Sequence, residues 1–199
     1  MQIREHAEAN PDKPAVILYP SGTVVTFGEM EARANRLAHL FLQAGLREGD
    51  AVAILMEINE QYHTVMWAAR RSGLYHVPIN SHLTAAEAAC IIGNSAAKAI
   101  VESAALRPVP EGLAEHLPNS RPDLLLIAGD DLEGWLQYPD CVADQPVTPI
   151  PDEIEGDLMQ YSTRMLKLPE AVRNSYDLSS LERIMYAAAP TPESSTSRA

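Results

Sequence analysis

The feature that most constrains the fold is a regular alternation of short apolar runs with helical stretches between residues 50 and 127. The helical stretches span residues 60–73 and 84–95, and the second begins at Thr84. Continuous apolar runs of this length are typical of strands buried on both faces of a parallel sheet. Strand–helix alternation at this spacing predicts an α/β fold with a mostly parallel sheet. Strands are expected near residues 51–56, 75–79, 98–102 and 123–127.

The N-terminal region carries the signals of a β-hairpin followed by a capped helix. The stretch AVILYPSGTVVTF at 15–27 places a Pro-Ser-Gly turn between two apolar runs. Thr26 is a candidate N-cap, and Glu29 completes a capping box three residues later. The helix should end at Gly45. Its apolar face carries Met30, Ala34, Leu37, Ala38, Phe41 and Leu42.

The C-terminal third has a different texture. Prolines at 139, 146, 149 and 151 stand among acidic residues in the segment 138–156, which predicts an extended crossing and not a helix. Residues 158–160 are expected to resume a strand. Residues 164–176 suggest a helix interrupted at Pro169, and residues 191–199 suggest a disordered tail.

Composition limits the classes of function. A hydrophobic content of 46% with 21% charged residues is typical of a soluble domain, and the net charge of −12 disfavours nucleic acid as a partner. Cys90 and Cys141 show no CxxC spacing, so we expect reduced cysteines. The polar N-terminus predicts no secretory signal, and the apolar runs are too short for a transmembrane segment. These features together predict a cytoplasmic protein.

Catalytic motifs are weak throughout the chain. The six histidines have no metal-ligand spacing, and neither GxSxG, GxGxxG nor GxxxxGK[ST] occurs. Lys13, Lys98 and Lys167 are the only lysines, and a solvated surface position is the default reading for each. Residue chemistry alone therefore leads to a soluble α/β domain with no predicted catalytic residue and no predicted metal ligand.

The order of the elements carries a resemblance. "NPDKPAVI", then the stretch from "VTFGEMEARANRLAHLFLQAGLREGDAVAILM" to "LTAAEAACIIGNSAAKAIV", closely resembles the start of AMP-forming acyl-CoA synthetases, in the fatty-acid–CoA ligase branch of the adenylate-forming superfamily. The resemblance implies that residues 1–163 are the N-terminal α/β part of such a synthetase. Residues 164–190 resemble a later segment of the same domain. An incomplete N-terminal domain, with an internal deletion and a C-terminal truncation, is the resulting expectation.

The same resemblance implies ATP, Mg and CoA as cofactors and a fatty acid as substrate. In the family, a strand like "GDLMQYS" leads into a Ser/Thr/Gly-rich loop that ends in Pro-Lys-Gly and holds the ATP phosphates. Here Ser162 and Thr163 are followed by Arg164-Met165-Leu166, which has neither the glycines nor the lysine. The chain is therefore expected to bind none of these cofactors productively and to be catalytically inactive.

One further turn of the family has a counterpart in this sequence. Ala188, Ala189 and Pro190 match a turn that lies beside the adenine and acyl groups in the family, so they are the predicted cofactor-binding residues, although an ordinary strand-end turn explains them equally well. Three hypotheses stay open: an acyl-CoA synthetase by descent, a non-catalytic remnant or partner module of an intact homologue, and a generic α/β small-molecule binder. Self-association is also expected, because apolar faces after residue 164 lack their family partners.

Overall fold

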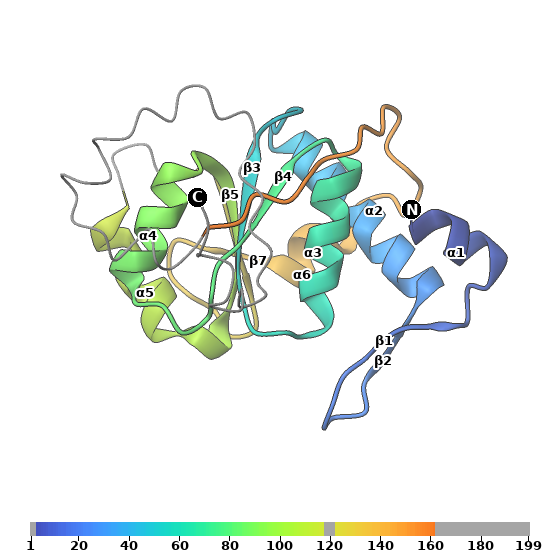
Figure 1. Ribbon diagram of the computed structural model, residues 1–199, viewed down its shortest axis with the longest axis horizontal. Helices are drawn as coiled ribbons and strands as arrows, with labels where there is room; N and C mark the ends of the chain where they lie inside the picture. Colours follow the sequence, from blue (N-terminus) through green and yellow to red (C-terminus); the bar gives the residue numbers. More distant parts are fainter. Residues whose placement is uncertain (1–2, 118–121, 162–199) are drawn as a thin grey trace, which may run out of the picture.

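The computed structural model describes residues 3–117 and 122–161, and its centre is a five-stranded parallel sheet (Figure 1). The strand order is β4-β3-β5-β6-β7, and every neighbouring pair is parallel. The α/β prediction and the four predicted strands are confirmed. The strands are β3 (Ala51–Leu55), β4 (Tyr75–Pro78), β5 (Ala97–Ser103), β6 (Leu124–Ala128) and β7 (Leu136–Gln137).

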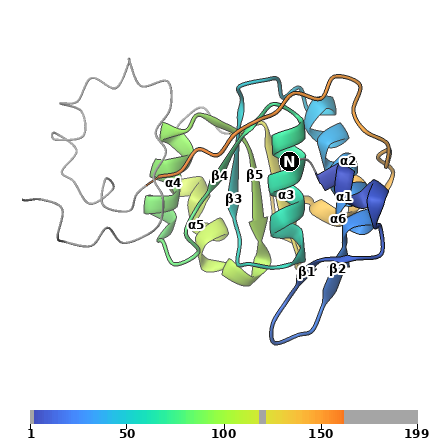
Figure 2. The ribbon, with the colours of Figure 1, turned by 45° about the vertical axis from the view of Figure 1, so that its right-hand side comes forward.

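Helices cover both faces of this sheet. Figures 1 and 2 show three helices against one face, namely α2 (Phe27–Gln43), α3 (Glu60–Arg71) and α6 (Tyr138–Ala143). The other face carries α4 (Ala85–Asn94) and α5 (Pro108–His116), which follows the short 3₁₀ turn η1 (Ala104–Leu106). The connections from β3 to β4, from β4 to β5 and from β5 to β6 are crossovers that return through a helix, whereas a loop over residues 129–135 joins β6 to β7.

The core consists of two layers because neighbouring side chains of a strand point to opposite faces. Ile54 and Val101 pack toward α2, α3 and α6, whereas Leu55 and Ile100 pack toward α4 and α5. All five residues of β3 are buried, as expected for a strand in the middle of a doubly covered sheet. The continuous apolar runs in the sequence reflect this burial on both sides.

The N-terminal unit stands apart from the sheet. It contains α1 (Ile3–Ala9) and an antiparallel hairpin of β1 (Pro14–Ile17) and β2 (Val24–Thr26), which extends away from the body in Figures 1 and 2. The predicted capping box is present: the Glu29 amide donates to Thr26 Oγ1 at 3.2 Å, and the Thr26 amide donates to Glu29 Oε2 at 2.9 Å. Gly45, with φ of +90°, follows the end of α2 as expected.

The prediction of a wholly non-helical segment over 138–156 is wrong, because residues 138–143 form α6. Pro139 lies in the first turn of that helix, where the missing N–H would have no intrahelical acceptor, so proline is tolerated. Residues 144–161, called the strap below, are extended and cross α2 and α3 to reach the edge of the sheet. The expected strand at 158–160 is reduced to an isolated parallel bridge between Leu158 and His76.

Backbone and side-chain hydrogen bonds hold the strap. Asn35 Nδ2 donates to the Val147 carbonyl at 2.7 Å, and the Ile154 amide donates to the Arg71 carbonyl at 3.3 Å. At β4, the His76 amide donates to the Asp157 carbonyl and the Met159 amide donates to the His76 carbonyl, both at 3.0 Å. The strap therefore extends the sheet by a short, irregular pairing with the edge strand β4.

A cluster of charges fastens α1, α2, α3 and the strap to one another. The buried Arg71 guanidinium lies 2.5 Å from a Glu31 carboxylate oxygen and 3.6 Å from Glu153, and Arg4 lies 2.5 Å from Glu153. Burial alone would raise the pKa of Glu31, but the hydrogen bond and the charge of Arg71 outweigh it and hold that pKa below its usual value. The cluster is structural: every charge in it has an opposite partner.

Candidate functional site at the carboxyl edge of the sheet

The strand order contains one point at which the direction of winding reverses. The chain runs from β3 to β4 on one side, and then crosses to β5 on the other side of β3. The helices that follow the two adjacent strands β3 and β5 consequently lie on opposite faces of the sheet. In open parallel sheets, ligands bind outside the carboxyl ends of the strands at such a switch point. Topology alone therefore makes this edge the first place to look for a site.

Three polar side chains meet at the switch point. Glu57 follows β3, and its Oε1 accepts hydrogen bonds from Ser103 Oγ at the end of β5 and from Asn59 Nδ2, each at 3.0 Å. Asn59 is the N-cap of α3, and its Oδ1 accepts from the amides of Gln61 and Tyr62, each at 3.0 Å. The second oxygen of Glu57, Oε2, is buried and has no hydrogen-bond partner within the described residues. One acceptor position at this edge therefore has no donor among the described residues.

The charge of this edge suits a hydrogen-bond donor and not a phosphate. A helix N-terminus ordinarily attracts anions, but here the Glu57 carboxylate already lies beside the first turn of α3. Lys98 forms an ion pair with Asp50 at 2.9 Å near the opposite, amino end of the strands, and Lys13 is exposed before β1. Neither described lysine reaches the switch point, whereas Lys167 lies outside the described residues.

A second carboxyl group, that of Glu102, lies within the sheet itself. Glu102 is fully buried on β5, in register with Leu55 and Ile127, and neither of its oxygens has a hydrogen-bond partner in the described part of the chain. Burial raises the pKa of Glu102 to about 9, so this carboxyl is protonated at neutral pH. The sequence carries a signal of this buried carboxyl group, because Glu102 is the single charged residue of the run AIVES.

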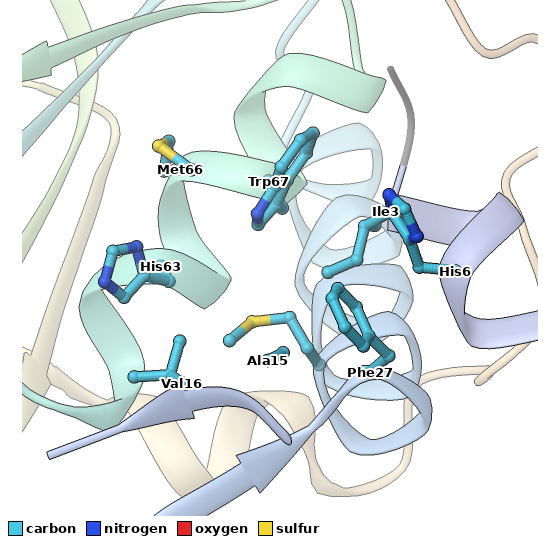
Figure 3. A pocket seen from close by; sticks show the side chains of 9 residues that line it. Ile3, His6, Ala15, Val16, Phe27, His63, Met66 and Trp67 are labelled. Atoms are coloured by element: carbon cyan, nitrogen blue, oxygen red, sulfur yellow. The ribbon is translucent and has the colours of Figure 1, made fainter. Parts of the chain in front are cut away.

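An apolar groove of about 480 Å³ lies between α1, β1, α2 and α3 (Figure 3). In Figure 3 the side chains of α1 and α3 face each other across it, with Val16 of β1 below. Burial lowers the pKa of His63, which favours its neutral form, and the His6 ring lies 5.0 Å from that of Phe27. The groove is lined by Ile3, His6, Ala15, Val16, Phe27, Met30, His63, Met66 and Trp67.

The structure does not describe the residues predicted from the sequence to bind a cofactor. Ala188, Ala189 and Pro190 lie outside the described residues, as does the junction Ser162-Thr163-Arg164. Within residues 3–117 and 122–161, no three histidine, cysteine, aspartate or glutamate side chains come together as a metal site. Sequence reasoning missed Glu57 and Ser103, because their meeting depends on the pairing of β3 with β5.

Comparison with known proteins identifies the family. Residues 3–162 match the sequence pattern of the AMP-binding enzymes, which covers the whole described sheet and the strap. The chain belongs to the AMP-binding enzyme family. No helix among the residues that the structure describes is long and apolar enough to cross a membrane.

Relatives within the AMP-binding enzymes include ligases of fatty acids. The chain is 30% identical over 178 residues to the long-chain-fatty-acid–CoA ligase FadD13 of Mycobacterium tuberculosis, across 88% of this chain and 34% of that protein. It is 31% identical over 130 residues to the fatty acid–[acyl-carrier-protein] ligase ScoC of Streptomyces coeruleorubidus, across 65% of this chain and 24% of that protein. The chain thus spans between a quarter and about a third of the length of these curated relatives.

Solved structures of the AMP-binding enzymes share the fold. A long-chain-fatty-acid CoA ligase structure from Rhodopseudomonas palustris matches with a TM-score of 0.68 at 26% identity, over 79% of this chain and 39% of that one. The N-terminal domain of FACL13 from Mycobacterium tuberculosis matches with a TM-score of 0.69 at 24% identity, over 83% of this chain and 41% of that one. The sheet described above is therefore the N-terminal α/β architecture of this family.

Proposed function

We propose that this chain supplies the N-terminal α/β part of an ATP-dependent, AMP-forming fatty-acid–CoA ligase, and that residues 1–199 by themselves do not carry out the reaction. The observation that supports the first half is the match of residues 3–162 to the AMP-binding enzymes, together with fatty-acid ligases among the relatives. Under this proposal residues 1–163 are the N-terminal α/β part of an AMP-dependent synthetase, residues 164–190 a displaced family-like segment and residues 191–199 a disordered tail. The protein is proposed to act in the cytoplasm.

The proposed reaction has two steps. A carboxylate oxygen of the fatty acid attacks the α-phosphorus of ATP, an O–P bond forms, and pyrophosphate leaves. The thiol of CoA then attacks the acyl carbon and loses its proton, and AMP leaves with the electron pair of the broken C–O bond. ATP, Mg and CoA are the cofactors proposed for an intact ligase of this type. Both steps require charge on phosphate to be neutralised by preorganised donors.

The second half of the proposal rests on which donors residues 1–199 offer. The described lysines point elsewhere, since Lys98 is paired with Asp50 and Lys13 is exposed before β1. At the switch point Asn59 Oδ1 already accepts from the first-turn amides of α3, and the Glu57 carboxylate beside it repels phosphate. After Thr163 the sequence continues with Arg164-Met165-Leu166 and no glycine-rich loop. Loss of one preorganised donor typically costs about 3–4 kcal/mol of transition-state stabilisation, and here several are missing together.

Exchange of labelled pyrophosphate into ATP, in the presence of a fatty acid, tests the adenylation step directly. We expect no exchange above background from purified residues 1–199, whereas intact FadD13 serves as the positive control. Fatty-acid-dependent exchange that disappears in Arg164→Ala but survives in Arg47→Ala would show that the junction binds phosphate after all. Calorimetric titration with ATP and Mg separates loss of binding from loss of chemistry.

A non-catalytic role is the second candidate. Here the chain is a remnant or a partner module that binds an intact homologue. Its support is the same lack of phosphate donors at the switch point among the described residues, combined with a sheet that is buried on both faces. The pyrophosphate assay distinguishes the two when the chain is added to an intact ligase: a partner module changes the activity of that ligase, and a remnant leaves it unchanged. Ala188, Ala189 and Pro190 remain the predicted contacts to adenine in either case.

A further inference from the structure

The two halves of the strap are attached by separate sets of contacts. Figures 1 and 2 show the strap in orange, passing over α2 and α3 toward β4. Its first half is held on α2, where Asn35 bonds to the Val147 carbonyl and Ile150 is buried in the core. Its second half, residues 152–161, is called the clasp below. Residues 151–152 are exposed and make no backbone hydrogen bond to the rest of the described chain, so the strap has a hinge point between its halves.

Four backbone hydrogen bonds hold the clasp against α3 and β4. The tightest joins the Gly156 amide to the Arg70 carbonyl at 2.6 Å. Apart from Gly156, no residue of the clasp is fully buried. The clasp therefore buries little apolar surface and should open at a lower free energy than the sheet. The four donors, called the reporter amides below, are those of Ile154, Gly156, His76 and Met159.

Gly156 makes the docking of the clasp all-or-none. Its backbone lies so close to Leu74 that a Cβ at this position would overlap the carbonyl oxygen and the nitrogen of Leu74. Gly156 is the only glycine of the clasp, so any shift of register along β4 would bring a side chain to this point. The clasp is therefore docked in the observed register or detached, with no intermediate register available.

The clasp also carries a carboxylate that reaches α1. Glu153 Oε1 accepts a hydrogen bond from Arg4 Nη2 of α1 at 2.5 Å and lies 3.6 Å from the buried Arg71. Among the described residues, the other carboxylate near Arg4 is that of Glu31, at 3.6 Å. With seven residues and one fully buried side chain, Ile3, α1 has little stability of its own. Its position therefore depends on the contact between Arg4 and Glu153.

We propose that the clasp opens and closes as one unit about residues 151–152, and that its closing fixes α1 against α2 and α3 through Glu153. The open state separates Arg4 from its nearest carboxylate and loosens the wall of the apolar groove that carries Ile3 and His6 (Figure 3). The edge strand β4 and the groove are thereby coupled through one two-state element. The inference is independent of the proposed enzymatic function.

Hydrogen exchange of the full chain at low concentrations of urea tests whether the clasp is one unit. Amides that become accessible in the same opening event share one opening free energy and one dependence on urea. We expect the four reporter amides to share a value below that of the amides of β5 and β6, with a weaker dependence on urea because less surface becomes exposed. Four different values, or values equal to those of β5 and β6, would overturn the proposal.

Gly156→Ala should open the clasp, because the added Cβ has no space beside Leu74. We expect the reporter amides to exchange at least about tenfold faster, while β5 and β6 keep their protection. Glu155→Ala is the matched control: its side chain is 60% exposed and pairs with Arg70, so its loss should change the rates less than about twofold. Protection that is unchanged in Gly156→Ala, or that is lost over β5 and β6 as well, would contradict a separate clasp.

The link to α1 is tested with Glu153→Gln, which keeps the shape of the side chain and removes its charge. The α1 amides, and the Asn10 amide that donates to the His6 carbonyl at 2.9 Å, should exchange faster in Glu153→Gln and in Gly156→Ala. Because both changes act through one contact, the double variant should exchange over α1 no faster than the faster single variant. Effects that multiply in the double variant would overturn the coupling, as would α1 exchange that neither change alters.

Discussion

The central sheet and the N-terminal unit obtain their stability in different ways. Every residue of β3 and β6 is buried, and helices cover both faces of these strands. The core of the N-terminal unit consists of only Ile3, Val25 and Met30, with a few partly buried neighbours. Full burial of one large apolar side chain contributes about 1.5–3 kcal/mol, so the sheet is expected to fold as one cooperative unit. The N-terminal unit depends instead on its contacts with α2 and α3, through Met30 and Trp67.

Truncating one core side chain in the sheet and one in the N-terminal unit should lower stability by different amounts and in different places. Leu126→Ala removes a fully buried side chain from β6 and is expected to cost about 2–5 kcal/mol of global stability. Val25→Ala removes a fully buried but smaller side chain from β2, and should cost about 1.5 kcal/mol. Urea unfolding measures the global cost, and hydrogen exchange shows where protection is lost. Loss of protection over β3 and β5 in Val25→Ala would contradict the separation of the two regions.

Within the sheet, Glu102 is the largest departure from an apolar core. Its pKa is raised from 4.5 to about 9 in the folded state, so the folded protein holds a proton that the unfolded chain has lost. Stability is therefore fully present below about pH 4.5 and falls as pH rises toward 9, with a loss of about 3 kcal/mol by pH 7. Glu102→Gln keeps the shape, cannot ionise and should abolish this slope.

The measurement is urea unfolding of the wild type and of Glu102→Gln at several pH values between 5 and 8.5. Glu111→Gln is the matched control, because Glu111 is exposed on α5 and should leave the slope as in the wild type. Equal pH slopes for the wild type and Glu102→Gln would mean that Glu102 finds a charged or donor partner in solution.

The junction between sheet and strap should respond to acid in the opposite sense. His76 is buried on β4 beside the strap, and burial first, with the charge of Arg70 second, lowers its pKa from 6.5 to about 4. The unfolded chain therefore takes up a proton that the folded chain refuses, and stability is lost as pH falls from 6.5 toward 4. The loss at pH 5 should be about 2 kcal/mol. His76→Gln should reduce this loss of stability between pH 6.5 and pH 4, while His39→Gln should leave it unchanged. If His76→Gln loses as much stability in acid as the wild type, His76 is not the cause of that loss.

The sequence predicts the strands of the sheet and the elements of the N-terminal unit through different signals. The strands of the sheet were predictable because burial on both faces requires unbroken apolar runs, as in AVAIL of β3 and LLLIA of β6. The hairpin and the start of α2 were predictable from local chemistry, namely a Pro-Ser-Gly turn and a Thr26–Glu29 capping box. Each of these signals lies within a few residues of the structure that it specifies.

The features that escaped prediction depend on long-range contacts or on position within an element. Pro139 was read as a helix breaker, but its effect depends on whether it falls in the first turn of a helix, as it does in α6. The switch-point contact joins Glu57 to Ser103, and the groove joins α1 to α3, so neither has a local signature. The predicted cofactor contacts at 188–190 lie outside the described residues and stay predictions.

The smallest expected effect concerns two helix caps, one in each region, that are built in the same way. Thr26 caps α2 at the end of the hairpin of β1 and β2, and Thr84 caps α4 on the sheet; each is part of a complete capping box, with Glu29 and Glu87 respectively. Removing a threonine cap typically costs about 1 kcal/mol, so Thr26→Ala and Thr84→Ala should each lower global stability by a similar, small amount. Their local effects should differ, because Thr26 is also the last residue of β2, so loss of the hydrogen bond from the Glu29 amide to Thr26 Oγ1 loosens the hairpin from the helix that follows. Hydrogen exchange should therefore show lower protection over residues 14–26 in Thr26→Ala, whereas Thr84→Ala should alter only the first turn of α4. If both variants lose protection evenly over the whole described chain, the N-terminal unit unfolds together with the sheet, and the hairpin of β1 and β2 is then no more independent than any strand of the core.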